Sequence, residues 1–411
     1  MARPIFISLI PNFLPRHVKL AVKLLFDFKN YSNMDWSHEL EEKLKKYLSV
    51  PDIALTESGR VAEFLLLKAL GIGHGDEVII QAFTCVAVPN AIKWVGAIPV
   101  YGDIDDTLNL DPNGFESRIS NRTKAVIVQH TFGYPADLLR ISAVCKRRNI
   151  LLIEDCAHAL GGAYSGKKLG TVGDAAFFSF GRDKVISGVW GGAVVAKDPQ
   201  VMVRIKKELS ALPSRKKGWI AKQLLYVPLM DLVVRTYSFL GLGKLLHSIF
   251  QACGLLSKVL TSEEKRGEPS GQIYQGMPGA FAKLASIEFD DLDSFIAHRR
   301  SIAKYYADAF HMRYVEEHTY LRFSIMSVFA SEMRHAAKKR NIFLGDWYNV
   351  VVAPDTVDQK TTGYVLGSCL KAEQAASHIV NLPTHPRLPL TDASRIGYFV
   401  KNFIQAFTLR K

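Results

Sequence analysis

The sequence predicts an α/β fold in which a mostly parallel sheet is covered by helices on both faces, followed by a smaller C-terminal α+β domain. Short apolar runs rich in Val, Ile and Phe alternate with helical patterns between residues 52 and 197. The chain has 411 residues, which is too long for one small domain. Hydrophobic residues make up 48% and charged residues 22%, a balance typical of folded globular proteins.

The runs that read as strands are Glu77–Gln81, Ile98–Gly102, Ala125–His130, Leu151–Asp155, Ala175–Phe180 and Ala193–Ala196. The helical patterns between them span Val61–Leu70, Val86–Val95 and Asp137–Arg148. This alternation predicts parallel strands joined by crossover helices. In folds of this kind the ligand lies beyond the carboxyl ends of the strands.

We expect four parts along the chain. Residues 1–50 form an N-terminal segment, 51–200 the large domain, 201–270 a helical insertion, and 271–411 a long helix with the small C-terminal domain. The long helix is expected over roughly Pro278 to Phe310.

The segment 201–270 is basic and amphipathic. It holds twelve basic and five acidic residues, a balance of +7 out of the +13 of the whole chain. One predicted apolar stripe contains Leu229, Leu232, Val233, Tyr237 and Leu240, with Asp231, Arg235 and Ser238 opposite; a second contains Leu245, Ile249, Cys253, Leu256 and Leu260, after a turn at Gly241 and Gly243. We expect this insertion to lie against an anionic membrane surface or a partner, outside the catalytic core. The alternative is that its stripes pack on the protein's own body or across a dimer.

Several classes of protein are disfavoured. Five scattered cysteines show neither a disulfide framework nor metal-ligand spacing, so we expect no metal site and a reducing, cytoplasmic compartment. The N-terminal residues lack the pattern of a signal peptide, and no uncharged apolar run reaches the roughly 18 residues of a membrane span. The basic segment has few aromatic residues to stack on bases, so nucleic-acid binding is not expected.

Three local motifs could carry chemistry. Asp155 ends an apolar strand, where burial of a carboxylate is costly unless it meets a cation; the structural alternative is a helix cap. Ser179 and Lys184 follow the next strand and place a hydroxyl and an amine on one loop. Ser58-Gly59-Arg60 precede a helix whose N-terminus can bind phosphate, although Ser58 alone reads as a cap.

Together these motifs resemble the sugar aminotransferases of the DegT–StrS type, which belong to fold type I of the pyridoxal phosphate (PLP) enzymes. The resemblance continues through 65–79, 123–127, 130–137 and 381–386, well beyond the three motifs. It implies that Lys184 binds PLP covalently as an imine and moves a proton. It implies that Asp155 holds the pyridine nitrogen protonated, that His158 lies near the ring hydroxyl, and that Ser58, Gly59 and Ser179 contact the phosphate.

The chain departs from the family pattern in three places. Arg60 stands where Thr is common, and we expect it to contribute to phosphate binding. Cys85 stands where an aromatic ring covers the cofactor, and Phe83, on the same face of an extended segment, could take over that role. The stretch Ile273–Pro278 replaces an Asn-Tyr-Arg-like motif that the neighbouring subunit lends.

The resemblance implies an aminotransferase, working as a homodimer, that moves an amino group from glutamate to a keto-sugar. We expect this sugar to be linked to a nucleotide and to belong to polysaccharide or amino-sugar biosynthesis. One alternative is a sugar dehydratase of the same fold, which would have histidine in place of Lys184. Another is a non-catalytic or regulatory protein associated with the inner face of the membrane. The sequence does not identify the sugar, the carbon aminated, its carrier or the amino donor.

Overall fold

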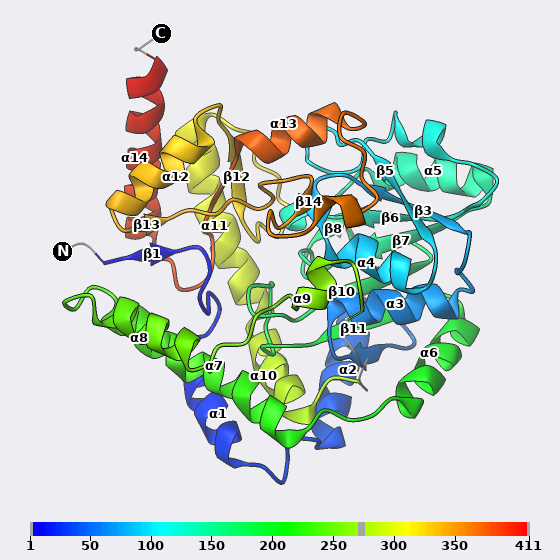
Figure 1. Cartoon of the computed structure of the whole chain (residues 1–411), viewed down its shortest axis with the longest axis horizontal. Helices are drawn as coiled ribbons and strands as arrows, with labels where there is room; N and C mark the ends of the chain where they lie inside the picture. Colours follow the sequence, from blue (N-terminus) through cyan, green and yellow to red (C-terminus); the bar gives the residue numbers. More distant parts are fainter. Residues whose placement is uncertain (1–2, 270–275, 409–411) are drawn as a thin grey trace.

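The computed structural model describes residues 3–269 and 276–408, and its centre is a seven-stranded sheet (Figure 1). The strand order is β2-β11-β10-β7-β6-β3-β5. Their bounds are β2 Ala54–Thr56, β3 Glu77–Gln81, β5 Ile98–Gly102, β6 Thr123–Gln129, β7 Leu151–Asp155, β10 Ala175–Ser179 and β11 Gly192–Ala196. Only β11 runs antiparallel to its neighbours in this sheet. The predicted mostly parallel sheet is therefore confirmed.

Both faces of the sheet are buried, as the near-continuous apolar strands require. In β6, Val126 and Val128 join one core cluster while Ala125 and Ile127 join a second cluster on the opposite face. The first core includes residues of α1 Pro15–Phe26, α2 Met34–Leu48, α5 Leu138–Arg148 and α10 Gly279–Asp290. The second includes residues of α3 Gly59–Ala69, α4 Ala87–Trp94, α6 Pro199–Ala211 and α13 Leu370–His378.

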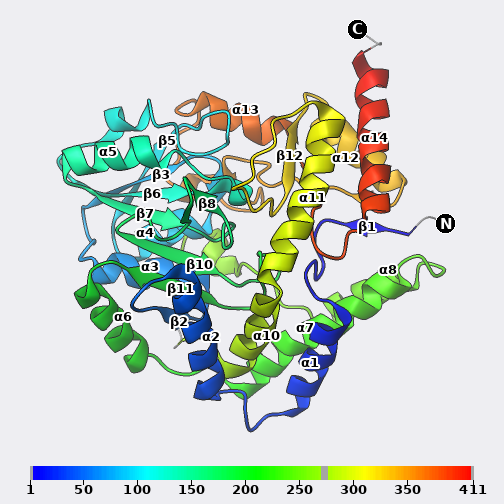
Figure 2. The ribbon, with the colours of Figure 1, turned by 180° about the vertical axis from the view of Figure 1, so that it is seen from behind.

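The C-terminal part has a core of its own, built around the buried residues Tyr306, Phe323 and Ile396. Its elements are α11 Leu292–Phe310, β12 Phe323–Met326, α12 Ala330–Lys339, β13 Ile342–Phe343, β14 Val352–Ala353, η3 Gln359–Thr361, β15 Ile379–Leu382 and α14 Leu390–Thr408. The N-terminal strand β1 Ile5–Phe6 pairs with β13, so this strand joins the smaller body (Figure 2). Strand β14 pairs with β4 Thr84–Cys85, which links the smaller body to the large sheet domain.

The remaining short elements lie in connections. They are η1 Phe115–Arg118, η2 Thr131–Gly133, the hairpin of β8 Ala163–Tyr164 and β9 Lys167–Lys168, and α9 Ser262–Lys265.

The helical stretch expected over Pro278 to Phe310 is two helices, α10 and α11, that meet at Asp291. Asp291 ends α10 and precedes α11, with φ −95° and ψ −1°. Its carboxylate forms an ion pair with Arg16 and a 3.0 Å hydrogen bond with His17, both on α1. The contacts of Asp291 with α1 join distant segments and cannot be predicted from the apolar periodicity, which continues from α10 into α11.

The segment 201–270 contains α7 Lys217–Thr236 and α8 Leu242–Ala252, joined at Gly241, whose φ of +75° favours glycine. The stripe predicted on α7 is confirmed at Val233, which is buried in the first core, but is wrong at both Leu232 and Leu240. Leu232 is 43% and Leu240 93% exposed, whereas Asp231, predicted on the polar side, is buried. Asp231 is buried because it forms ion pairs with Arg235 and with Arg387, a partner that helical periodicity cannot reveal.

Helix α7 packs on the protein itself, while α8 lies at the margin of the molecule (Figure 1). Ile220, Leu224 and Val227 of α7 belong to the first core cluster, and α7 contacts α1 along its length. Residues of α8 keep large exposed apolar side chains, among them Leu245 and Ile249. The packing alternative therefore holds for α7. Among the described residues, no helix is long and apolar enough to cross a membrane.

Candidate active site

A cavity of about 660 Å³ opens at the carboxyl ends of the central strands. Asp155 at the end of β7 and Ser179 at the end of β10 line it, together with Ser58 and Gly59 at the start of α3. Of the other predicted site residues, Arg60, Cys85, His158 and Lys184 line the same cavity. Segments distant in sequence therefore converge at the place that the parallel topology predicts.

Phe83 is the one predicted site residue that does not line the cavity. Its backbone has φ +64°, so the segment before Cys85 is not extended and the expected alternation of side chains fails. The ring is fully buried and meets Phe132 and Tyr348 edge to face, with centroids 6.3 and 5.4 Å away. Phe132 and Tyr348 line the cavity in its place.

The start of α3 has the features of a phosphate site. Ser58 caps the helix, since its hydroxyl accepts a hydrogen bond of 3.4 Å from the Val61 amide. The first intrahelical bond is donated by Ala62, which leaves the Gly59 and Arg60 amides at the positive end of the helix dipole. A Cβ on Gly59 would lie 2.9 Å from Cβ of Ser179, so only glycine allows this close approach of helix and strand. Helix amides and the hydroxyl-bearing residue Ser179 thus meet at one end of the cavity.

Arg60 lies at the same end but is held by the insertion. It forms an ion pair with Glu264 and donates a 3.0 Å hydrogen bond to the Val259 carbonyl. Glu57, which precedes Arg60 by three residues, pairs with Arg215 instead. The partner of Arg60 could not be read from the sequence, because Glu264 lies some two hundred residues away.

Asp155 is buried and accepts a hydrogen bond of 2.9 Å from the Ala157 amide. Burial raises the pKa of the Asp155 carboxyl, while the Ala157 amide and the positive charge of Lys184 act in the opposite direction. A cation placed in the cavity beside this carboxylate would offset the cost of its burial. The buried carboxylate of Asp155 therefore fits a protonated pyridine ring as its partner.

His158 presents a neutral imidazole to the cavity. Its ring lies nearly parallel to Phe132, with centroids 5.8 Å apart, and its Nδ1 accepts a 3.3 Å hydrogen bond from the Phe132 amide. Burial, followed by the charges of Lys184 and Arg322, lowers the pKa of His158 well below its ordinary value. With Nδ1 accepting, the proton of the neutral ring lies on Nε2, which can donate to an oxygen of a bound ligand.

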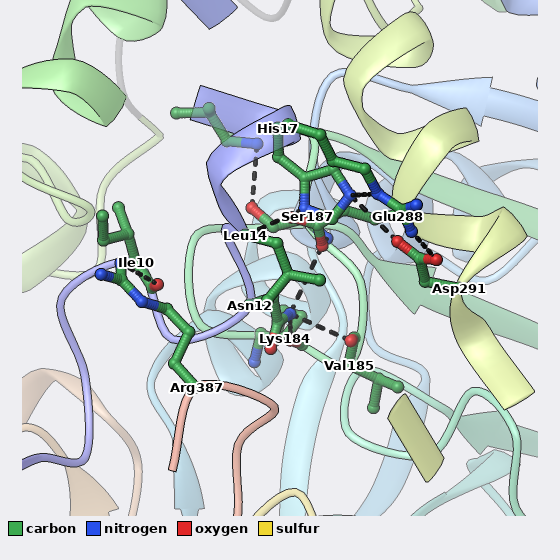
Figure 3. A network of polar contacts seen from close by, with 12 residues as sticks. Ile10, Asn12, Leu14, His17, Lys184, Val185, Ser187, Glu288, Asp291 and Arg387 are labelled. Atoms are coloured by element: carbon green, nitrogen blue, oxygen red, sulfur yellow. Dashed lines mark hydrogen bonds and ion pairs between the residues drawn. The ribbon is translucent and has the colours of Figure 1, made fainter. Parts of the chain in front are cut away.

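The loop that carries Lys184 is held by a buried polar network that the sequence analysis missed (Figure 3). The Asn12 side-chain amide donates to the carbonyl oxygens of Lys184, at 2.7 Å, and Val185, at 3.0 Å. Glu288 accepts a 2.7 Å hydrogen bond from the Ser187 amide. Arg299 in turn donates to Oδ1 of Asn12 at 2.7 Å. No local pattern marks these residues, since they come from three separate parts of the chain.

Glu63 is a second carboxyl group on the cavity wall. It is buried, and its Oε1 has no hydrogen-bond partner among the residues that the structure describes. Burial and then the charges of Asp155 and Cys85 raise the pKa of Glu63 well above its ordinary value. The raised pKa favours the protonated form of Glu63, in which the carboxyl group can donate a hydrogen bond.

The insertion forms part of the cavity, so the expectation that it lies outside the catalytic core is wrong. Tyr226, Lys258 and Lys265 line the cavity. Arg182, two residues before Lys184, donates to the Ser257 carbonyl at 2.9 Å and lies 3.6 Å from the centre of the Tyr226 ring. The stretch Ile273–Pro278 is the one expected to replace a motif of the family. Its residues 273–275 lie outside the part of the chain that the structure describes.

Comparison with known proteins agrees with this geometry. Residues 18–226, half of the chain, match the model of the DegT/DnrJ/EryC1/StrS aminotransferase family. GDP-perosamine synthase of Escherichia coli O157:H7 is 40% identical over 41% of this chain and 46% of its own length. L-glutamine:2-deoxy-scyllo-inosose aminotransferase of Streptomyces kanamyceticus is 44% identical over 38% of this chain and 36% of its own length. The matches therefore span less than half of these two relatives.

Solved structures extend the likeness to the whole fold. A Bacillus subtilis protein with bound pyridoxamine phosphate (PMP) superimposes with a TM-score of 0.71 and 19% identity, over 98% of this chain and 86% of that protein. This likeness confirms the predicted fold type I architecture. The family match, the converging motifs and the shared fold lead to one conclusion: the chain belongs to the DegT/DnrJ/EryC1/StrS aminotransferase family.

Proposed function

We propose that this protein is a PLP-dependent aminotransferase that delivers an amino group to a keto-sugar. The observation that carries the proposal is that Lys184, Asp155 and the start of α3 line one cavity. In this proposal Ser58, Gly59 and Ser179 hold the phosphate, Asp155 faces the ring nitrogen, and Lys184 binds the cofactor covalently. When bound, the cofactor supplies the electron sink that lets an amino group pass between two substrates.

The protein's own residues supply binding and proton transfer. Asp155 stays ionised against the positive ring nitrogen, and neutral His158 donates a hydrogen bond from Nε2 to the ring hydroxyl oxygen. The Lys184 amine takes a proton from the substrate carbon next to nitrogen, and returns one during the second half of the reaction. The backbone of Lys184 is fixed by Asn12, so its amine is positioned before substrate binds.

The proposed acceptor is a keto-sugar carried on a nucleotide, within polysaccharide or amino-sugar biosynthesis. The names of the two relatives support this class, since one is a GDP-sugar synthase and the other aminates a cyclic ketone. The cavity wall also offers aromatic and cationic side chains, Trp190, Trp347, Lys258 and Lys265, suited to a base and its phosphates. The proposed amino donor is glutamate.

Trapping of the cofactor tests the proposal. Protein loaded with PLP and reduced with borohydride should retain a covalent adduct on the peptide that contains Lys184. Lys184→Ala should lose both the adduct and amino transfer from glutamate. Lys197→Ala is the matched control, because Lys197 is an exposed lysine of the same domain that should not affect either. An adduct of unchanged yield in Lys184→Ala would refute the assignment.

We propose further that the protein is a homodimer in the cytoplasm. The family resemblance supports this, because the family completes its site with a segment from the neighbouring subunit. One chain has a mass of 45.8 kDa, and light scattering of the purified protein should give twice this mass. A mass that stays at one chain over micromolar concentrations would refute it.

We also propose that α8 touches the inner face of an anionic membrane. Phe239, Leu240, Leu245 and Ile249 on and beside this helix are exposed, and Lys244 lies among them. Binding to phosphatidylserine vesicles in a flotation assay should be strongest at low salt and should be lost in Leu245→Glu/Ile249→Glu. Failure of the unmodified protein to float at low salt would refute this contact.

A further inference from the structure

Arg322 is a buried cation on the wall of the cavity, next to β12. Its residue exposure is 5%, and its guanidinium stacks on the Trp347 ring at 3.4 Å from the ring centre. Nη2 forms a 2.7 Å ion pair with Oδ2 of Asp183. Nη1 has no hydrogen-bond partner among the described residues. Nη2 of Arg322 therefore binds Asp183, and Nη1 is available to bind another acceptor.

A buried N–H without a partner destabilises the protein, and more so on a charged group. Such a donor on a cavity wall marks a place where a ligand supplies the acceptor. Arg60 cannot serve in this way, because its terminal nitrogens bind Glu264 and Val259. Arg182 likewise commits both of its terminal nitrogens, to Ser257 and Gln223.

The position of Arg322 connects it to the reacting centre. Asp183, its partner, is the residue immediately before Lys184. Burial lowers the pKa of His158, and the charge of Arg322 acts in the same direction. Burial raises the pKa of Tyr348, and the charge of Arg322 opposes this rise. An anion bound to Arg322 would therefore lie beside His158 and Lys184, while the phosphate site lies at the start of α3.

We propose that Arg322 binds a carboxylate of the amino donor, and that Asp183 occupies the guanidinium when no donor is bound. This inference rests on the proposed aminotransferase function. A planar guanidinium binds a carboxylate through two parallel hydrogen bonds, which Nη1 and the Nη2 released by Asp183 can provide. An aminotransferase admits a carboxylate-bearing donor and a keto-sugar by turns, and Asp183 keeps Arg322 paired while the sugar reacts.

Glutarate is a suitable probe, because it has the two carboxylates of the donor but no amino group to react. Its affinity for the PLP-loaded protein can be measured by calorimetry and by the change in the visible absorbance of the cofactor. Arg322→Gln should weaken glutarate binding by about tenfold or more, the equivalent of losing a charged hydrogen bond. Asp183→Asn should tighten it severalfold, since the internal competitor loses its charge.

Arg300→Gln is the matched control, because Arg300 lies on α11 and contacts the His318 carbonyl and Glu316, outside the cavity. It should bind glutarate as the unmodified protein does. Asp183→Asn keeps the test valid if Arg322→Gln fails to fold, and unchanged or weaker glutarate binding in Asp183→Asn overturns the proposal. Unchanged binding in folded Arg322→Gln overturns it as well.

Inorganic phosphate separates the two sources of an anion. Binding of phosphate that depends on Arg322, with no binding of glutarate, would assign the residue to the sugar carrier and overturn the donor site. Calorimetry needs no turnover, so it reports on Arg322 even in a protein that fails the borohydride test. The borohydride test therefore decides the proposed function, and the glutarate measurements decide the role of Arg322.

Discussion

The side-chain amide of Asn12 donates a hydrogen bond of 2.7 Å to the carbonyl oxygen of Lys184, across 172 residues of sequence. Asn12 is fully buried and also accepts a hydrogen bond from Arg299. The N-terminal arm thus fixes the backbone from which the reactive amine extends. Asn12 is therefore a positioning residue, which acts on Lys184 and does not itself touch a ligand.

Asn12→Ala should remove the hydrogen bonds to the carbonyl groups of Lys184 and Val185 and the bond from Nη2 of Arg299. Each such loss costs about 1–3 kcal/mol, so the free energy of unfolding should fall by several kcal/mol. The rate at which Lys184 captures added PLP, followed by visible absorbance, should fall too, because the loop is no longer fixed. Exposed Asn113→Ala is the control; equal effects of both substitutions on the capture rate would contradict the positioning role.

Glu288 should make stability depend on pH. Burial raises the pKa of Glu288 from 4.5 to about 8, against the Ser187 amide, Asn12 and Arg299. The folded state then holds a proton that the unfolded state releases, so the stabilisation is complete below pH 4.5 and is lost as pH rises through about 8.

Urea unfolding of Glu288→Gln and of the unmodified protein at a series of pH values measures this effect. The difference in free energy of unfolding should change by up to about 1.4 kcal/mol per pH unit between these limits. Exposed Glu316→Gln should give a profile parallel to that of the unmodified protein. A parallel profile for Glu288→Gln would show that Glu288 titrates alike in both states.

Asp155→Asn should keep the covalent adduct on Lys184 but lose catalysis. Without the carboxylate the ring nitrogen gives up its proton, and the electron sink weakens. Loss of a charge pair of this kind costs several kcal/mol, on the order of a thousandfold in the rate of amino transfer. Single-turnover rates with glutamate measure it, with exposed Asp198→Asn as control. Near-normal rates of amino transfer in Asp155→Asn would contradict the pairing of Asp155 with the ring nitrogen.

Arg60→Ala should weaken binding of PLP by about tenfold, since it removes a cation beside the phosphate end of the cavity. Binding of pyridoxal, which lacks the phosphate, should change little. Glu264→Gln should strengthen PLP binding, because the ion pair with Glu264 competes for the guanidinium. If Arg60→Ala affects PLP and pyridoxal equally, Arg60 serves the insertion and not the phosphate.

The sequence by itself determined the features that depend on local pattern. Strand β7 ends at Asp155 as predicted, because its apolar run is covered on both faces and the chain must turn at the acid. Ser58 caps α3, since a capping hydroxyl stabilises a helix start whatever packs around it. The parallel alternation then places these residues at one edge of the sheet.

Tertiary structure alone decided which side chains from distant segments meet. The burial of Asp231 required Arg387, and the direction of Arg60 required Glu264. Phe83 lies outside the cavity, with a positive φ directly before the residues of β4 that pair with β14. Asn12 and Arg322 reached the site by chain folding with no motif of their own. A buried polar group is stable only beside its partner, and the identity of that partner is a property of the packed chain.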